Sequence, residues 1–146
     1  MRKESVGKYI AAIHRNSQMI INHKLREYDI RSGQHDFLYV IANNEGLSQK
    51  ELSEILNIGK ATTAKAVKNL LASGYIKRET DDEDKRFFKL YLTEKGKEIE
   101  DTINKTFDEM IEIYSSGFSE DEYDATLDTL SRIFDNVIQV TKANKE

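Results

Sequence analysis

The residues best suited to chemistry are the small, polar and basic side chains between positions 60 and 69. At ~100° per residue, a helix starting here collects them on one side. These are Ala61, Thr62, Lys65, Lys68 and Asn69, opposite a side formed by Thr63, Ala66, Val67, Leu70 and Leu71, and Lys60 at the start of the helix completes the predicted DNA-binding set. Ala61 and Thr62 can contact thymine methyls in a DNA major groove, while Thr62 and Lys65 can bond base edges and Lys68 a phosphate. The solvated side of an ordinary amphipathic helix would show the same pattern.

The charge around this segment favours the DNA interpretation. Five basic residues and no acidic residue lie between Lys60 and Arg78. Exclusion of carboxylates suits a surface that faces phosphates, whose neutralisation makes binding depend on salt.

A second candidate segment is the charged stretch from Asp81 to Arg86. Lys85 and Arg86 would attract phosphates, whereas the four preceding carboxylates would repel them. We expect some carboxylates to hold Arg86 or to cap the turn, so that the guanidinium projects toward a minor groove. A charged hairpin tip facing only solvent is the alternative.

The surrounding pattern predicts a helix-turn-helix followed by a hairpin. Ser48 and Glu51 form a capping box for a short helix ending at Leu56, and Leu47 is placed to pack on Leu52. A turn over residues 57–59 leads to a helix from 60 to about 73, closed by Gly74. Alternating residues then predict strands over 75–80 and 87–92, which make the charged segment a "wing" between them.

The flanking segments are predicted to be helical. Apolar spacing indicates one long helix from Val6 through about Tyr28, and Ser32 can cap a second that ends near Asn43. Thr93 can cap a later helix, and a second capping box, Ser119 with Glu122, opens the last one. The last helix has an apolar seam at the 3.5-residue average of coiled coils. We therefore predict a mainly α fold with a small β-hairpin, in the order α-α-α-α-β-β-α-α.

Composition narrows the class of protein. The 146 residues include no cysteine, which excludes disulfides, thiolate metal sites and thiol switches, and no proline, which suits long helices. The net charge of −4 hides a division: residues 98–146 hold thirteen acidic and four basic residues, whereas residues 47–97 carry a net +3. A charged start and short apolar runs predict a cytoplasmic protein without signal peptide or membrane span.

An enzyme is not expected. The sequence has no phosphate-binding loop, nucleophile motif or paired carboxylates. His14, His23 and His35 lack the spacing of metal ligands, so neither a metal nor a cofactor is expected.

The chain resembles the MarR (multiple antibiotic resistance regulator) family of winged helix-turn-helix transcription factors. The resemblance rests on residues 46–52, 59–70 and 73–76, and above all on residues 81–96, which resemble the family wing signature D-P-x-D-R-R-x-x-x-L-x-L-T-x-x-G. Asp82 replaces the usual proline, Lys85 an arginine, and Gly59 the usual capping serine or threonine. These departures, with differences at Thr63 and Ala64, concern the operator sequence rather than the fold.

The resemblance implies a homodimer on a pseudo-palindromic DNA site. Residues 32–96 would form the DNA-binding part, with residues 1–31 and 97–146 interlocking as dimerisation helices. Recognition contacts carry over to Ala61, Thr62 and Lys65, and the minor-groove contact to Arg86. The family also implies a small anionic or phenolic effector. By position, His14, Arg15 and Tyr39 could line its cleft.

We therefore expect a sequence-specific DNA-binding regulator, a homodimeric repressor of a nearby operon that a small ligand relieves. The alternative is a winged-helix protein-interaction module that never touches DNA. Replacement of Lys65 and Arg86 separates the two, because only the regulator would lose operator affinity.

Overall fold

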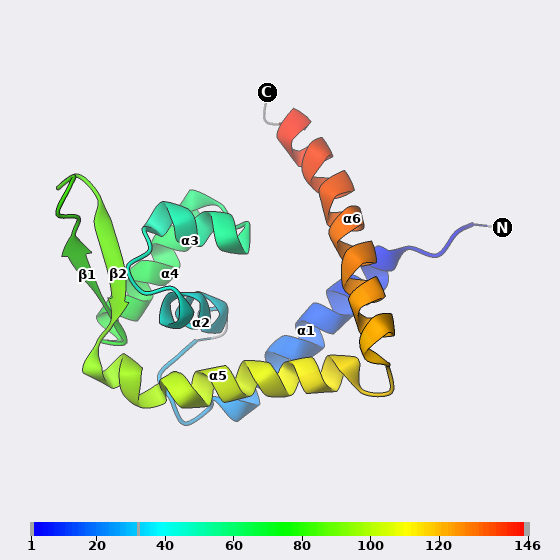
Figure 1. The fold of residues 1–146 in the computed structure, drawn as a ribbon, viewed down its shortest axis with the longest axis horizontal. Coiled ribbons are helices and arrows are strands. Elements are labelled where there is room, and N and C mark those ends of the chain that lie inside the picture. Colours follow the sequence, from blue (N-terminus) through cyan, green and yellow to red (C-terminus); the bar gives the residue numbers. More distant parts are fainter. Residues whose placement is uncertain (1, 32, 145–146) are drawn as a thin grey trace. The chain divides into compact units, whose positions relative to one another are not determined.

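The computed structural model describes residues 2–31 and 33–144, which form six helices and one two-stranded hairpin (Figure 1). This mainly helical fold with its predicted element order is confirmed. The chain divides into two compact units, residues 1–108 and 109–146. No helix in the described part of the chain is both long enough and apolar enough to span a membrane.

Helix α1 (Val6–Lys24) is shorter than predicted. Ser5 caps its start by accepting a hydrogen bond from the Gly7 amide at 3.0 Å. The prediction that it continues to about Tyr28 is wrong, because the Arg26 guanidinium donates to the His23 carbonyl at 2.8 Å and closes the last turn. The Asp29 amide then donates to the Tyr75 hydroxyl at 3.2 Å. A contact distant in sequence therefore fixes the path after α1.

Three helices form the core beside the hairpin: α2 (His35–Asn43), α3 (Gln49–Leu56) and α4 (Lys60–Ala72). The predicted cap of α2, Ser32, lies outside the described residues, and Gln34 precedes the helix without a side-chain cap. Fully buried apolar side chains from these helices pack together: Leu38, Ile41, Leu52, Val67 and Leu70. The predicted turn joins α3 to α4, with Asn57 in the left-handed region at φ 50°.

The hairpin is anchored to the helices at its base. Strands β1 (Ile76–Thr80) and β2 (Phe88–Leu92) pair antiparallel, with Arg78 opposite Leu90 and Thr80 opposite Phe88. Residues 46 and 47, just before α3, form an isolated antiparallel β-bridge with Leu90 of β2. The Gly46 amide donates to the Leu90 carbonyl at 2.8 Å, and the Leu90 amide donates to the Leu47 carbonyl at 2.9 Å. The hairpin base and the start of α3 are thus hydrogen-bonded to each other.

Helix α5 (Glu94–Ser115) begins as predicted, with the Gly96 amide donating to the Thr93 hydroxyl at 3.1 Å. The Thr93 hydroxyl also donates to the Gly74 carbonyl at 2.5 Å, which ties the start of α5 to the end of α4. Further along, the Tyr39 and Phe107 rings stack with centroids 4.3 Å apart. These contacts join α5 to the core of the first unit.

In the second unit, α6 (Glu120–Asn144) follows the predicted capping box. The Glu122 amide donates to the Ser119 hydroxyl at 3.1 Å, and the Ser119 amide to the Glu122 carboxylate at 3.0 Å. The hydrogen bond from the Ser119 amide and, to a smaller extent, the Ser119 hydroxyl lower the pKa of the Glu122 carboxyl. The apolar seam of α6 is exposed: Leu127, Leu130, Phe134 and Val137 retain between 43% and 57% of their accessible surface.

A buried histidine predicts a pH-dependent stability for the first unit. His35 is 1% exposed, and its Nδ1 has no hydrogen-bond partner in the described part of the chain. Burial lowers the pKa of His35, despite opposing contributions from the Asp36 charge and the Ile30 backbone. Burial also raises the pKa of Asp36, against the charges of His35 and His14.

We expect the free energy of unfolding to fall as the pH drops below the ordinary histidine pKa of about 6.5. In that range the unfolded chain binds a proton at His35 that the folded chain does not bind. The free energy of unfolding then falls by at most about 1.4 kcal/mol per pH unit. Asp36 has the opposite effect at lower pH, since its raised pKa favours the folded state in acid. Urea unfolding of the wild type and His35→Gln from pH 7.5 to 5 measures the slope. Equal slopes would contradict this assignment to His35.

Candidate nucleic-acid interface

The side of α4 that we predicted to contact DNA bases, which we call its reading side, is exposed. Ala61, Thr62, Lys65 and Lys68 face solvent, as does Lys60 at the start of the helix, while Asn69 is half-buried. The opposite side is buried at Thr63, Ala66, Val67 and Leu70, with Leu71 half-buried. The side that the helical wheel predicted to face outward is therefore exposed except at the half-buried Asn69, and α4 presents small residues near its start and lysines further along.

A buried hydroxyl pair fixes α3 against α4. The Ser53 hydroxyl donates to the Thr63 hydroxyl at 2.7 Å, and the Thr63 hydroxyl donates to the Gly59 carbonyl at 3.1 Å. Ser53 is 8% exposed and Thr63 is fully buried. Both hydroxyls are out of water, so the pair joins α3 to the first turn of α4 and each hydroxyl depends on the other for a partner.

Thr63→Val keeps the shape of the side chain but leaves the buried Ser53 donor without a partner. We expect a loss of about 2 kcal/mol in the free energy of unfolding. The double variant Ser53→Ala, Thr63→Val removes both hydroxyls and should be less destabilised than the sum of the single changes. Urea unfolding of the wild type, the two single variants Ser53→Ala and Thr63→Val, and the double variant measures this coupling. Additive losses of stability would show that the two hydroxyls are not coupled.

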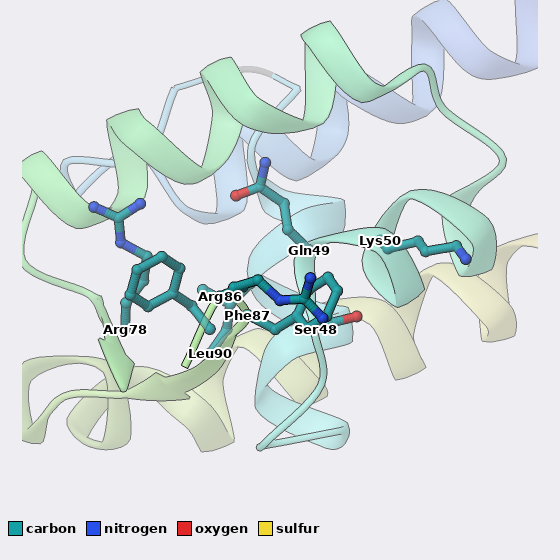
Figure 2. Close-up of a pocket in the computed structure, with 8 residues that line it drawn as sticks. Ser48, Gln49, Lys50, Arg78, Arg86, Phe87 and Leu90 are labelled. Atoms are coloured by element: carbon teal, nitrogen blue, oxygen red, sulfur yellow. The ribbon is translucent and has the colours of Figure 1, made fainter. Parts of the chain in front are cut away.

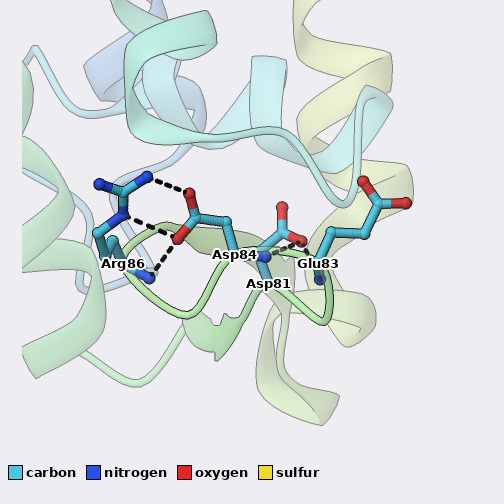
Figure 3. A network of polar contacts seen from close by, with 4 residues as sticks. All are labelled: Asp81, Glu83, Asp84 and Arg86. Atoms are coloured by element: carbon cyan, nitrogen blue, oxygen red, sulfur yellow. Dashed lines mark hydrogen bonds and ion pairs between the residues drawn. The ribbon is translucent and has the colours of Figure 1, made fainter.

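The wing tip, residues 81–87, is organised by two carboxylates (Figure 3). Asp84 accepts from the Arg86 Nε at 3.0 Å and from its Nη2 at 2.7 Å, which fixes the guanidinium in a two-point pair. Asp81 accepts from the Glu83 amide at 2.8 Å and shapes the turn. The prediction that carboxylates hold Arg86 and cap the turn is confirmed. The Arg86 side chain stays 83% exposed, and hydrogen bonds from Arg86 hold the pKa of Asp84 below its usual range.

Two adjoining hollows lie between the start of α3, the start of α4 and the hairpin. The first, of about 300 Å³, is lined by Ser48, Gln49, Lys50, Arg78, Arg86, Phe87, Phe88 and Leu90 (Figure 2). The second, of about 270 Å³, is lined by Gln49, Lys50, Ser53, Lys60 and Phe87. We call them together the α3–wing groove. Four of its lining residues are cationic and none is acidic.

Sequence reasoning missed most of this groove. It singled out Lys60 and Arg86 and placed Arg78 in the basic stretch, but it gave no role to Lys50, Phe87 or Phe88. The available signal was the pair of aromatic residues directly after Arg86, since strand alternation points only one of them toward the core. Lys85 is exposed on the wing tip and belongs to neither hollow.

The predicted effector residues lie outside the groove. His14 and Arg15 are exposed on α1, and the His14 charge acts on Asp36 at the start of α2. Tyr39 is half-buried against Phe107. Neither hollow of the groove includes any of the three. In the described part of the chain, no three histidine or carboxylate side chains gather in an arrangement that could hold a metal ion.

Comparisons with known proteins agree with this geometry. The family model described as "MarR family" matches residues 28–86. The uncharacterized HTH-type transcriptional regulator YybA of Bacillus subtilis (strain 168) is 31% identical over 140 residues, which cover 93% of each chain.

Two solved structures are also similar. A MarR transcriptional regulator from Methanosarcina mazei Go1 is 36% identical with a TM-score of 0.79, over 94% of this chain and 99% of the other. A putative MarR family regulator from Listeria monocytogenes, solved with a 26mer DNA, is 29% identical with a TM-score of 0.84, over 93% and 90%. These relatives are transcriptional regulators and not enzymes. On its sequence, its fold and these matches, the chain belongs to the MarR family of winged-helix regulators.

Proposed function

We propose that this chain is a sequence-specific DNA-binding transcriptional regulator that works as a homodimer on a pseudo-palindromic operator. The observation that carries the proposal is the joint exposure of the α4 reading side and the Arg86 guanidinium. A small, polar helix face fits a major groove, and a fixed arginine fits the adjacent minor groove. The similar Listeria monocytogenes regulator was solved with DNA, which supports the same use here.

In this proposal residues 32–96 contact DNA, and residues 1–31 and 97–146 form the dimer. The exposed seam of α6 supports dimerisation, since an apolar stripe of this length marks a protein interface. On α1, Val6, Tyr9, Ile10 and Ile13 form a second exposed apolar row. The acidic charge of residues 98–146 would keep these helices away from phosphates.

The proposal extends to repression of a nearby operon and its relief by a small anionic or phenolic effector. For the effector we retain His14, Arg15 and Tyr39. The stacked Tyr39–Phe107 pair offers an aromatic wall, and His14 and Arg15 are accessible cations or donors on α1. Titration of the operator complex with such compounds tests this extension.

The decisive experiment is selection of genomic fragments at near-physiological salt, followed by titration of the recovered duplex. We expect a palindromic motif and a complex containing twice the 16.9 kDa chain. Lys65→Ala should weaken operator binding by about tenfold, because it removes a base-edge contact from each half-site. The matched control is Lys105→Ala on α5, which changes the charge equally and should bind as the wild type does. Recovery of no enriched motif would favour the protein-interaction module.

A further inference from the structure

The α3–wing groove lies between the two elements that the proposed function assigns to DNA. Lys60, at the start of α4, lines one end, and Arg86, on the wing tip, lines the other. In Figure 2, Arg78 and Lys50 extend to opposite sides of the view, with Arg86 and Phe87 between them. The two hollows share Gln49, Lys50 and Phe87, so the groove connects the start of the recognition helix with the wing, and its lining includes four cationic side chains.

The geometry of a DNA duplex indicates which part of the DNA would lie against the α3–wing groove. A major groove and the adjacent minor groove are separated by one sugar-phosphate strand. If α4 enters the first and Arg86 the second, that strand must cross the space between them. We propose that the α3–wing groove holds this strand, with Lys50 and Arg78 binding its phosphates and the Phe87 ring packing against its deoxyribose. This inference rests on the proposed function and adds three DNA-contacting residues to it.

Arg78 is positioned for this role by the hairpin register. Because it pairs with Leu90, its side chain shares the inner face of the hairpin with that buried leucine. Its guanidinium lies over the Phe88 ring at 5.1 Å from the centroid. This cation–π contact orients the charge without neutralising it. Neighbouring Lys77, in contrast, pairs with Glu79 at 3.4 Å on the outer face.

Phe87 is a large apolar residue that the fold leaves exposed. It retains 56% of its accessible surface, and the residues that line the groove with it are mostly polar or cationic. The Arg86 guanidinium lies 5.8 Å from its ring centroid. The sugar ring is the apolar part of a DNA strand, so an exposed aromatic ring among cations matches the alternation of sugar and phosphate.

The first test uses the salt dependence of operator binding, with the duplex recovered by the genomic selection. Lys50→Gln and Arg78→Gln should each make the logarithmic salt slope shallower by about 0.9 for every phosphate that the variant no longer neutralises. Phe87→Ala should weaken binding by about fivefold to tenfold at every salt concentration with the slope unchanged, since an apolar contact releases no counterions. Phe87→Leu, which keeps apolar area, should recover part of the loss.

Matched controls are available on the same unit. Ile55 is 54% exposed, and at ~100° per residue it lies on the side of α3 away from Gln49, Lys50 and Ser53. Ile55→Ala should therefore bind as the wild type does, and Lys105→Gln controls for the loss of one positive charge. Melting temperatures of all variants show whether any of them is unfolded, and Phe87→Leu covers the case in which Phe87→Ala is.

Hydroxyl-radical footprinting supplies a direct readout, because the radical attacks deoxyribose. The wild type should protect sugars on the strand between the major-groove and minor-groove contacts, and Phe87→Ala should lose that protection while keeping the contacts on either side. Unchanged protection and affinity in Phe87→Ala would overturn this inference and leave the proposed function intact. A wild-type chain that binds no duplex would overturn both, and retention of an apolar peptide by Phe87 would then assign the groove to a protein partner.

Discussion

Gly96→Ala is expected to destabilise the first unit by about 3 kcal/mol, a large effect for the addition of a single methyl group. A Cβ at Gly96 would overlap the Tyr75 carbonyl oxygen and would stand 3.2 Å from two atoms of the Leu92 side chain. The obstacle is backbone, so it cannot move aside as a flexible side chain would.

The clash lies where the end of α4, the end of β2 and the start of α5 meet. The Tyr75 carbonyl accepts from the Thr93 amide at 3.1 Å, and Lys95 donates to the Ser73 carbonyl at 2.6 Å. Relief of the clash requires the first turn of α5 to move away from the end of α4, which breaks these bonds together. Urea or thermal unfolding at fixed protein concentration measures the loss, with a fall in melting temperature of roughly 10 °C.

Gly59→Ala is the matched control, because no atom of the described residues other than its own chain neighbours lies within 4 Å of its Cβ position, and its φ of −62° suits alanine. We expect a change within about 1 kcal/mol, reflecting only the weaker N-cap preference of alanine. If Gly96→Ala unfolded at the wild-type temperature, α5 would have to start without the close approach of Gly96 to Tyr75.

The second large effect concerns binding. Arg86→Ala should lower operator affinity by about tenfold for each half-site, and therefore by about a hundredfold for a homodimer that makes the contact twice. The reason is that Asp84 already holds the guanidinium in one orientation, so little side-chain freedom is lost when DNA binds. Titrations of operator and mixed-sequence duplexes measure both affinity and specificity.

Asp84→Asn separates orientation from charge. It removes a carboxylate near phosphates, which favours all DNA, but it also releases Arg86, which penalises only the specific complex. We expect the ratio of specific to non-specific affinity to fall while non-specific binding rises. A ratio equal to that of the wild type would mean that the ion pair has no role in recognition.

The sequence predicted correctly those features of the fold that depend on residues close together in the chain. Both capping boxes, the Asn57 turn and the exposed side of α4 follow from residues within a few positions of each other. The path of the chain after α1 did not, because the Tyr75 hydroxyl that accepts from the Asp29 amide lies 46 residues away. The α3–wing groove was missed for the same reason, since the hairpin register decides that Arg78 and Phe88 meet beside Gln49.

The β-bridge between residues 46–47 and Leu90 has an evolutionary consequence. These bonds fix the hairpin base to the start of α3, whereas the hydrogen bonds of the tip, among the described residues, join residues of the tip to one another. Asp82, Glu83 and Lys85 are exposed, so substitutions there leave the buried core untouched. If the tip contacts DNA as proposed, a lineage can change its operator preference there at little cost in stability, while the hydrogen bonds at the base keep the hairpin fixed to the start of α3.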